Sequence, residues 1–376
     1  MIYKFLLLLI TIYSGIYWTN TAYAEVLFEE NFDDQPDWHS GLSENDHNND
    51  GIPDRVQIGS DGYLLPNGWY SSRQDPSWAP SVGYPDGRES IEILNKNSSF
   101  ARGGTGKSYV SWRDATEAPT FRWNSDSILS QYFPSGLGQV YVSFWIKFDP
   151  NWTPLGETGA SKLFRISSWD GVENIYGFGS DRYNGPVLFW DYKNTESGGV
   201  RNSLSFRGFP IDTNYIPRNP EFINMPRSSS SGDYGMNFDN NIRDLNGDGV
   251  EDNIINIKNL ITEEPLSGIV NHDEVWGQNW HKIEFFIKMN TSAGAFDGVL
   301  KQWIDGQLVF KNETLPWMGN QSAKNRKWNV ISFGGNDHFH AYTDSEKRQE
   351  WYSIDDIIIA DNPLNAPKPP TDLDIF

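Results

Sequence analysis

Apolar residues alternate with polar or aromatic ones in several short stretches of this chain. In residues 281–289, this alternation gives one face Ile283, Phe285, Ile287 and Met289. In residues 140–148, it gives one face Val142, Phe144, Ile146 and Phe148. A strand with this pattern buries one face and leaves the other polar. Such strands cover their apolar faces by packing sheet on sheet, so the pattern predicts a two-sheet antiparallel β-sandwich.

Further β-rich runs, punctuated by Gly, Pro, Asn and Asp, predict the remaining strands, and helical periodicity is scarce. The predicted strands are 26–28, 161–167, 174–179, 187–192, 298–304, 307–311, 329–333 and 352–360. The pair Asp305-Gly306 separates two of them and is a strong signal for a two-residue hairpin turn. We therefore predict an all-β fold.

The 34 Gly and 21 Pro residues favour strands joined by long loops. We expect a single domain over residues 25–361, with loop insertions near 34–90 and 195–275. Residues 362–376 are rich in proline and predict an extended tail or a linker remnant.

Residues 1–24 have the features of a signal peptide. Lys4 supplies a positive charge, an apolar run follows from Phe5 to Ile16, and Ala22-Tyr23-Ala24 is a small-x-small cleavage site. We expect a secreted protein, periplasmic or extracellular after cleavage. The alternative is an uncleaved membrane anchor, for which the apolar run is short.

The chain has no cysteine, and its formal net charge is −20. Disulfides, thiol catalysis and zinc–thiolate sites are therefore excluded. The acidic balance disfavours nucleic acid and anionic membranes as partners and suits calcium. It does not exclude an anionic substrate, because a local basic cleft can lie on an acidic protein.

A nine-residue pattern, DxNxDGxxD, occurs twice. Its oxygen-bearing residues are Asp46, Asn48, Asp50 and Asp54 in one copy, and Asp244, Asn246, Asp248 and Asp252 in the other. Carboxylates and amides at this spacing converge on a calcium ion, and glycine at the sixth position permits the sharp turn. An EF-hand would have Glu at the twelfth position, where this chain has Gln57 and Ile255. The loops resemble the calcium loops of thrombospondin type 3 and dockerin-like repeats; the alternative is a pair of acidic turns without metal.

Four segments resemble the concanavalin A-like jelly-roll superfamily of lectins, glucanases and polysaccharide lyases. They are FEENFDDQPDW at 28–38, WHKIEFFIKMN at 280–290, GVLKQWIDGQLVF at 298–310 and YSIDDIIIAD at 352–361. The resemblance implies a jelly-roll sandwich, in which a calcium ion often bridges the first and last strands. In this chain the resemblance implies that Asn31, Asp33 and Asp356 are ligands of such a calcium ion. The alternative is that these residues cap turns at the strand ends.

The resemblance also implies a glycan-binding concave face, with aromatic rings stacking on sugars. The candidate substrate-binding residues are Trp145, Lys147, Arg122, Lys282, Glu284, Lys301 and Trp303. Basic residues gathered on an otherwise acidic chain indicate a uronic-acid substrate. The alternative for each residue is a solvated outer face.

A lyase must neutralise the uronate carboxylate and remove the proton at C5 with a base. The candidate catalytic residues are His340, Tyr342, Arg165, Lys162 and His281, with 336–342 the segment richest in suitable groups. The alternatives are a surface loop with incidental histidines, and a His281 that only begins a strand. The glucanase motif ExDxxE is absent, as are the alginate-lyase signatures RxExR, QIH and YxKxGxYxQ.

The function that we predict is a calcium-binding, glycan-recognising protein, polysaccharide lyase-like, that cleaves an acidic polysaccharide by β-elimination. The first alternative is a non-catalytic carbohydrate-binding protein or adhesin using the same groove. The second is a structural surface protein with no groove. Basic residues that converge with Tyr or His would favour the lyase.

Overall fold

The computed structural model describes twelve segments of the chain. They are 24–75, 87–114, 122–152, 158–172, 174–177, 184–195, 199–207, 227–229, 235–241, 272–318, 326–339 and 349–364. Within them, strands form two sheets and helices are short: η1 (Ser43–Asn45), η2 (Gly59–Asp61), η3 (Asn95–Phe100) and α1 (His272–Val275). None of the helices in these segments is long and apolar enough to span a membrane.

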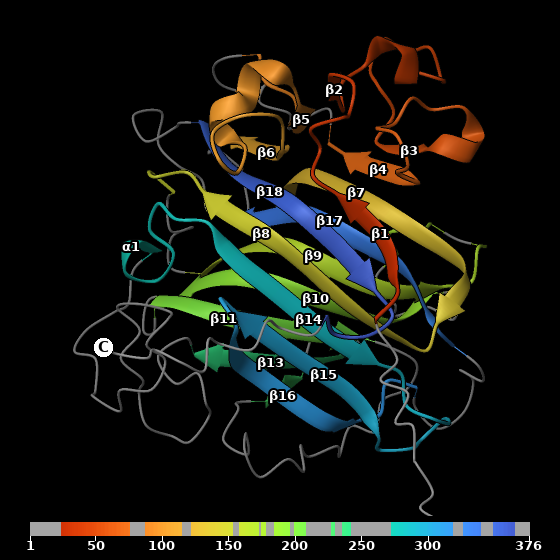
Figure 1. Ribbon diagram of the computed structural model, residues 1–376. Helices are drawn as coiled ribbons and strands as arrows, with labels where there is room; N and C mark the ends of the chain where they lie inside the picture. The colour runs from red at the N-terminus through yellow and green to blue at the C-terminus, as the bar shows by residue number, and fades with distance from the viewer. Residues whose placement is uncertain are drawn as a thin grey trace, which may run out of the picture.

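Sheet A has nine strands in the order β16-β15-β14-β8-β18-β6-β5-β2, with β1 paired to β18 (Figure 1). Their bounds are β1 Val26–Glu30, β2 Trp38–His39, β5 Ile91–Ile93, β6 Tyr109–Asp114, β8 Gln139–Phe148, β14 His281–Lys288, β15 Gly298–Ile304, β16 Gln307–Leu315 and β18 Gln349–Ala360.

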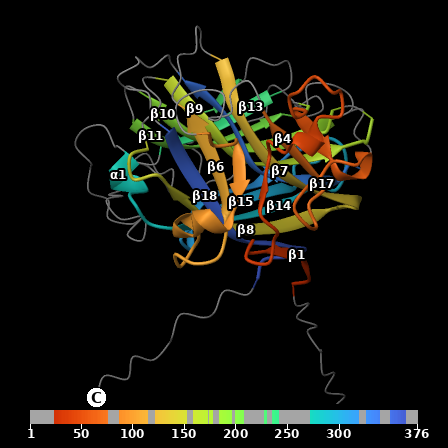
Figure 2. The same cartoon turned by 90° about the horizontal axis from the view of Figure 1, so that it is seen from above.

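Sheet B also has nine strands, in the order β12-β13-β11-β10-β9-β17-β7-β4-β3. Their bounds are β3 Val56–Ile58, β4 Ser71–Gln74, β7 Arg122–Leu137, β9 Thr158–Trp169, β10 Asn184–Thr195, β11 Gly199–Arg207, β12 Arg227–Ser229, β13 Gly235–Asn241 and β17 Trp328–Phe339. Figure 2 shows the two sheets as stacked layers. The prediction of an all-β fold with two antiparallel sheets stacked as a sandwich is thus confirmed.

Phenylalanine rings from both sheets meet in the core between the layers. Phe285 of β14 stacks on Phe164 of β9 with ring centroids 4.8 Å apart. Phe144 of β8 lies edge-on to Phe333 of β17 at 5.4 Å. All four side chains are fully buried. The apolar faces predicted for 281–289 and 140–148 are therefore the core faces.

Several local predictions can be compared with the strands. Asp305 and Gly306 have φ of 49° and 79° and join β15 to β16, as the hairpin signal predicted. The strand predicted at 174–179 is wrong over the described 174–177, which form a turn closed by the Gly177 N–H on the Asn174 carbonyl at 2.8 Å. Part of the stretch expected as an insertion near 195–275, in β11 and β13, extends sheet B.

A buried ionic cluster ties the two sheets together. Arg113 of β6 donates from Nε to Glu350 Oε2 of β18 at 3.0 Å, within sheet A. Its Nη1 donates to Asp337 Oδ1 of β17 at 3.1 Å, across the core to sheet B. Its guanidinium carbon lies 3.4 Å from the Trp152 ring centroid. All three charged side chains are buried, so each depends on the others for its hydrogen bonds.

We expect Arg113→Ala to lower the free energy of unfolding by about 3–5 kcal/mol, because it leaves two buried carboxylates without their cation. Urea unfolding would measure this. The matched control is Lys96→Ala, whose side chain is 62% exposed and lies 3.9 Å from Glu92, a geometry in which we expect a loss below about 1 kcal/mol. Equal losses in the two variants would contradict the role of the cluster.

Candidate functional site

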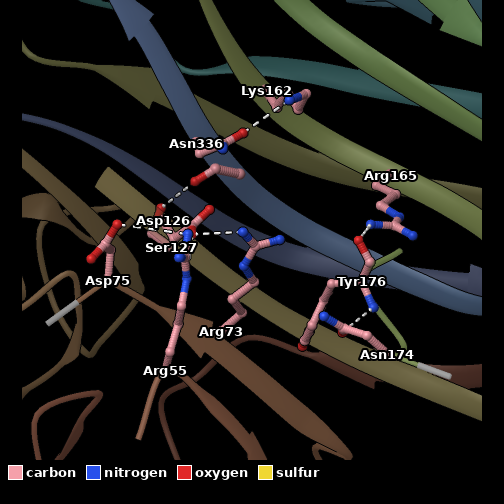
Figure 3. A network of polar contacts seen from close by, with 11 residues as sticks. Arg55, Arg73, Asp75, Asp126, Ser127, Lys162, Arg165, Asn174, Tyr176 and Asn336 are labelled. Atoms are coloured by element: carbon pink, nitrogen blue, oxygen red, sulfur yellow. Dashed lines mark hydrogen bonds and ion pairs between the residues drawn. The ribbon is translucent and has the colours of Figure 1, made fainter. Parts of the chain in front are cut away.

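The outward face of sheet B, which we call face B, carries many polar side chains beside a small apolar cluster that includes Ile128, Tyr176 and Val330. Phe164 and Phe333 point into the core, so their neighbours Arg165 and Ser332 point outward. The β9–β10 register shifts between Phe164 and Lys162, where Leu163 is an additional core residue, and this shift turns Lys162 to the outer side. Figure 3 shows this face around β4, β7, β9 and β17. Its described side chains include Ser71, Arg73, Asp126, Ser130, Lys162, Arg165, Phe189, Ser332 and Asn336.

Lys162 and Asn336 form a pair on face B. Lys162 Nζ donates to Asn336 Oδ1 at 3.0 Å (Figure 3). The register between β9 and β17 shifts between Phe333 and Asp337, and Asn336 lies within this irregular stretch, next to Lys162. A Cβ on Gly335 would lie 2.4 Å from the Lys162 carbonyl oxygen. Only glycine therefore lets β17 pass so close to β9, and this close approach sets the pair.

Arg165 anchors the segment 174–177 across the middle of face B. Its Nη1 donates to the Tyr176 carbonyl at 2.8 Å, and its Nη2 donates to the Gly177 carbonyl. Burial lowers the pKa of Arg165 to about 9, and the charge of Arg73 adds to this effect. The catalytic role expected for Arg165 does not fit this geometry, because the residue is only 4% exposed and its guanidinium donates to backbone carbonyls.

Asp126 collects two guanidinium groups at one side of face B. Arg73 Nη2 lies 2.9 Å from Asp126 Oδ2, and Arg55 Nε donates to the same oxygen at 3.1 Å. Tyr176 lies beside them, its hydroxyl 2.8 Å from Ser71 Oγ. Arg73 and Asp126 escaped prediction from the sequence, because β7 carries serine on both of its faces and gives no apolar alternation.

The groove expected from the sequence combined residues that the fold separates. Strands β8, β14 and β15 are neighbours in sheet A, whereas β9 belongs to sheet B. The outward side chains of sheet A, which we call face A, therefore lie on the opposite side of the sandwich from Lys162. They include Trp145, Lys147, Lys282, Glu284, Lys301 and Trp303. The interpretation of one shared groove is wrong.

His281 is committed to structural contacts. Its Nδ1 lies 2.8 Å from Asp305 Oδ2, and its Nε2 lies 2.7 Å from the Trp276 carbonyl. The side chain is buried at the start of β14. Both ring nitrogens are occupied, so the geometry does not support His281 as a catalytic base.

Some predicted residues cannot be placed. Arg122 begins β7, where it pairs with Phe339, but its side chain lies outside the described part. His340 and Tyr342 lie outside the described residues. So do the four residues predicted as ligands in the second DxNxDGxxD loop, Asp244, Asn246, Asp248 and Asp252.

The first DxNxDGxxD loop, residues 46–54, folds around its own polar side chains. Asp46 Oδ2 accepts the Gly51 N–H at 2.7 Å, and Asn48 Oδ1 accepts the Asp50 N–H at 2.8 Å. Asp54 Oδ2 accepts the Tyr63 hydroxyl at 2.7 Å. Among the described residues, no group of three or more His, Asp or Glu side chains is placed to hold a metal ion.

The first and last strands, β1 and β18, pair antiparallel, with Glu30 opposite Ile357. The candidate ligands there have other partners. Asp356 forms an ion pair with Arg102, and Asp33 Oδ1 accepts the Lys107 N–H at 3.0 Å. Asn31 Oδ1 accepts the Asp33 N–H. This donor set does not fit a calcium ion without displacing Arg102.

Comparisons with known proteins give structural similarities only. No family model and no curated protein matches the sequence. Alginate lyase Aly36B, solved with alginate tetrasaccharide, is 14% identical with a TM-score of 0.45, covering 90% of this chain and 98% of that one. Endo-β-1,4-glucuronan lyase from the fungus Trichoderma reesei is 13% identical with a TM-score of 0.43, covering 81% and 94%. The marine PL-14 alginate lyase from Aplysia kurodai is 13% identical with a TM-score of 0.41, covering 72% and 86%.

Burial of Asp355 gives a stability prediction with a definite sign. Burial raises the pKa of Asp355 from 3.8 to about 7, and the charges of Asp356 and Asp33 act in the same direction. The folded state therefore binds a proton that the unfolded state releases, so this contribution is complete below about pH 3.8 and is lost as pH rises towards 7. Urea unfolding at stepped pH should show Asp355→Asn gaining stability relative to the wild type over that window. A constant difference would contradict the raised pKa.

Proposed function

We propose that face B binds an acidic polysaccharide and that the chain cleaves it by β-elimination, as a polysaccharide lyase-like protein. The observation that carries the proposal is the Lys162–Asn336 pair on this face. An ammonium group and a carboxamide side by side suit a uronate carboxylate. The Asn336 amide nitrogen makes no hydrogen bond to another described residue, so it is available to donate to a ligand.

The chemistry requires charge stabilisation where charge develops. A base takes the proton at C5 of the uronate, and electron density moves onto the adjacent carboxylate. The C4–O bond then breaks as the C4–C5 double bond forms, and the leaving oxygen gains a proton. The Lys162 ammonium and the Asn336 amide would each donate to the carboxylate, which stabilises its developing charge.

A base is also required. His338, His340 and Tyr342 are the candidates, because they follow Asn336 within six residues of the chain and carry groups that can take a proton. Their side chains lie outside the described part of the chain. A neutral imidazole or a phenol at this place would suit proton transfer near neutral pH.

We expect Lys162→Ala and Asn336→Ala each to lower kcat/KM on a polyuronate by about 10²–10³, the scale for losing one preorganised donor. The ultraviolet absorbance of the unsaturated product measures the rate. Lys288→Ala, from the outward side of sheet A, is the matched control and should retain the wild-type rate. If no polyuronate in a panel gives absorbance with calcium present, cleavage is refuted; binding without cleavage would identify the non-catalytic alternative.

We further propose that the protein is exported and that its first DxNxDGxxD loop holds a structural calcium ion. Three carboxylates and one amide within nine residues form a donor set of the kind that calcium prefers. Asp46, Asn48, Asp50 and Asp54 would hold the ion and give the loop its rigidity. Extracellular calcium is abundant, which favours a permanent structural role over a switch.

EDTA should lower the melting temperature, because a ligand that binds only the folded state stabilises it, by about 2.7 kcal/mol at one hundred times Kd. Asp50→Ala should melt earlier in calcium and should respond less to EDTA. Asp61→Asn, an exposed acid outside the loop, serves as the control. An identical melting curve with and without EDTA would refute the structural ion.

A further inference from the structure

We infer that face A carries a second carbohydrate site, distinct from face B, and that its ligand is a neutral polysaccharide. The site is a cavity of about 770 Å³ between β1, β8, β14 and β18. Trp145 and Lys282 line it from the sheet, and Glu29, Asp34 and Asn67 line it from β1 and the loops.

One wall of the cavity carries the aromatic ring of Trp145, which is in contact with a cation. Trp145 is half-buried, and the guanidinium carbon of Arg102 lies 4.0 Å from its ring centroid. Arg102 is itself paired with Asp356 and is not among the residues that line the cavity. A cation–π contact thus holds the indole in one position. Because the side chain is already ordered, little conformational entropy is lost when a sugar ring packs on it. The C–H groups of a sugar ring pack well on such an electron-rich surface.

The rim offers hydrogen-bonding groups that no neighbour uses. Glu29, Asp34 and Asn67 are exposed, and their side chains make no hydrogen bond or ion pair to another described residue. Asn67 is positioned through its backbone, because Gln35 Nε2 donates to its carbonyl at 2.9 Å and Gln35 Oε1 accepts its N–H at 2.7 Å. Carboxylates and an amide around an aromatic platform can read sugar hydroxyls, which both donate and accept.

The charge of the cavity selects an uncharged chain. Four carboxylates line it, and Lys282 is the one cation among the lining residues. Lys282 Nζ also lies 3.1 Å from Glu284 Oε1, which offsets its charge. Like charges would repel a polyuronate here. A metal ion is a poorer fit, since Glu30 already accepts the Trp69 indole N–H and Asp356 pairs with Arg102.

Affinity electrophoresis of the full chain tests this inference. The gels would contain a soluble β-1,3-glucan, a galactomannan or a β-1,3/1,4-glucan, with a polyuronate gel for comparison. We expect at least one neutral polymer to retard the protein, and Trp145→Ala to weaken that retardation about tenfold in Kd, the scale of one lost aromatic contact. Phe296→Ala is the matched control: it removes an exposed aromatic ring that does not line the cavity.

The outcomes separate cleanly. Retardation by a neutral polymer that falls in Trp145→Ala but not in Phe296→Ala supports the site, with circular dichroism confirming that both variants fold. Absence of retardation in all three neutral gels, or equal losses in both variants, overturns it. If the polyuronate gel retards the protein and Trp145→Ala abolishes that retardation, the assignment of a neutral polysaccharide as the ligand is overturned. The measurement does not depend on cleavage, so its result stands whether or not face B proves to be catalytic.

Discussion

Period-two alternation in the strands is the constraint on which the rest of this molecule depends. Each strand gives one set of side chains to the shared core and the other set to an outer face, and no side chain serves both. Phe144, Phe164 and Phe285 fill the core from the two layers. Two outer faces therefore exist on opposite sides of the sandwich, and a ligand bound to one cannot touch the other.

The two outer faces are built differently. On face B, Arg165 holds the segment 174–177, in which Ile175 and Tyr176 pack with Ile128 and Val330, and the Tyr176 hydroxyl is buried against Ser71. A buried polar surface of this kind is stable only when its groups are paired. Lys162 and Asn336 pair with each other. Their ammonium and amide groups are the polar groups that we propose for ligand binding on this face.

Sequence patterns predicted the sheets well and the sites poorly, for one physical reason. The 281–289 strand and the Asp305-Gly306 turn carry local signals, and both formed as expected. Which strands are neighbours is not local information, so Trp145 and Lys162 looked equally suited to one groove. The ion pair between Asp126 and Arg73 could not be predicted from the sequence, because it forms only when β4 pairs with β7.

The charges on the two outer faces differ from each other and from the net charge of the chain. The chain is strongly acidic, yet Arg55, Arg73 and Lys162 gather on face B, whereas carboxylates line the cavity of face A. Near a surface, an opposite charge a few ångströms away matters more than the net charge screened beyond roughly 10 Å. The two faces would therefore discriminate between acidic and neutral chains by their own side chains. A net charge of −20 governs solubility and leaves each face to set its own selectivity.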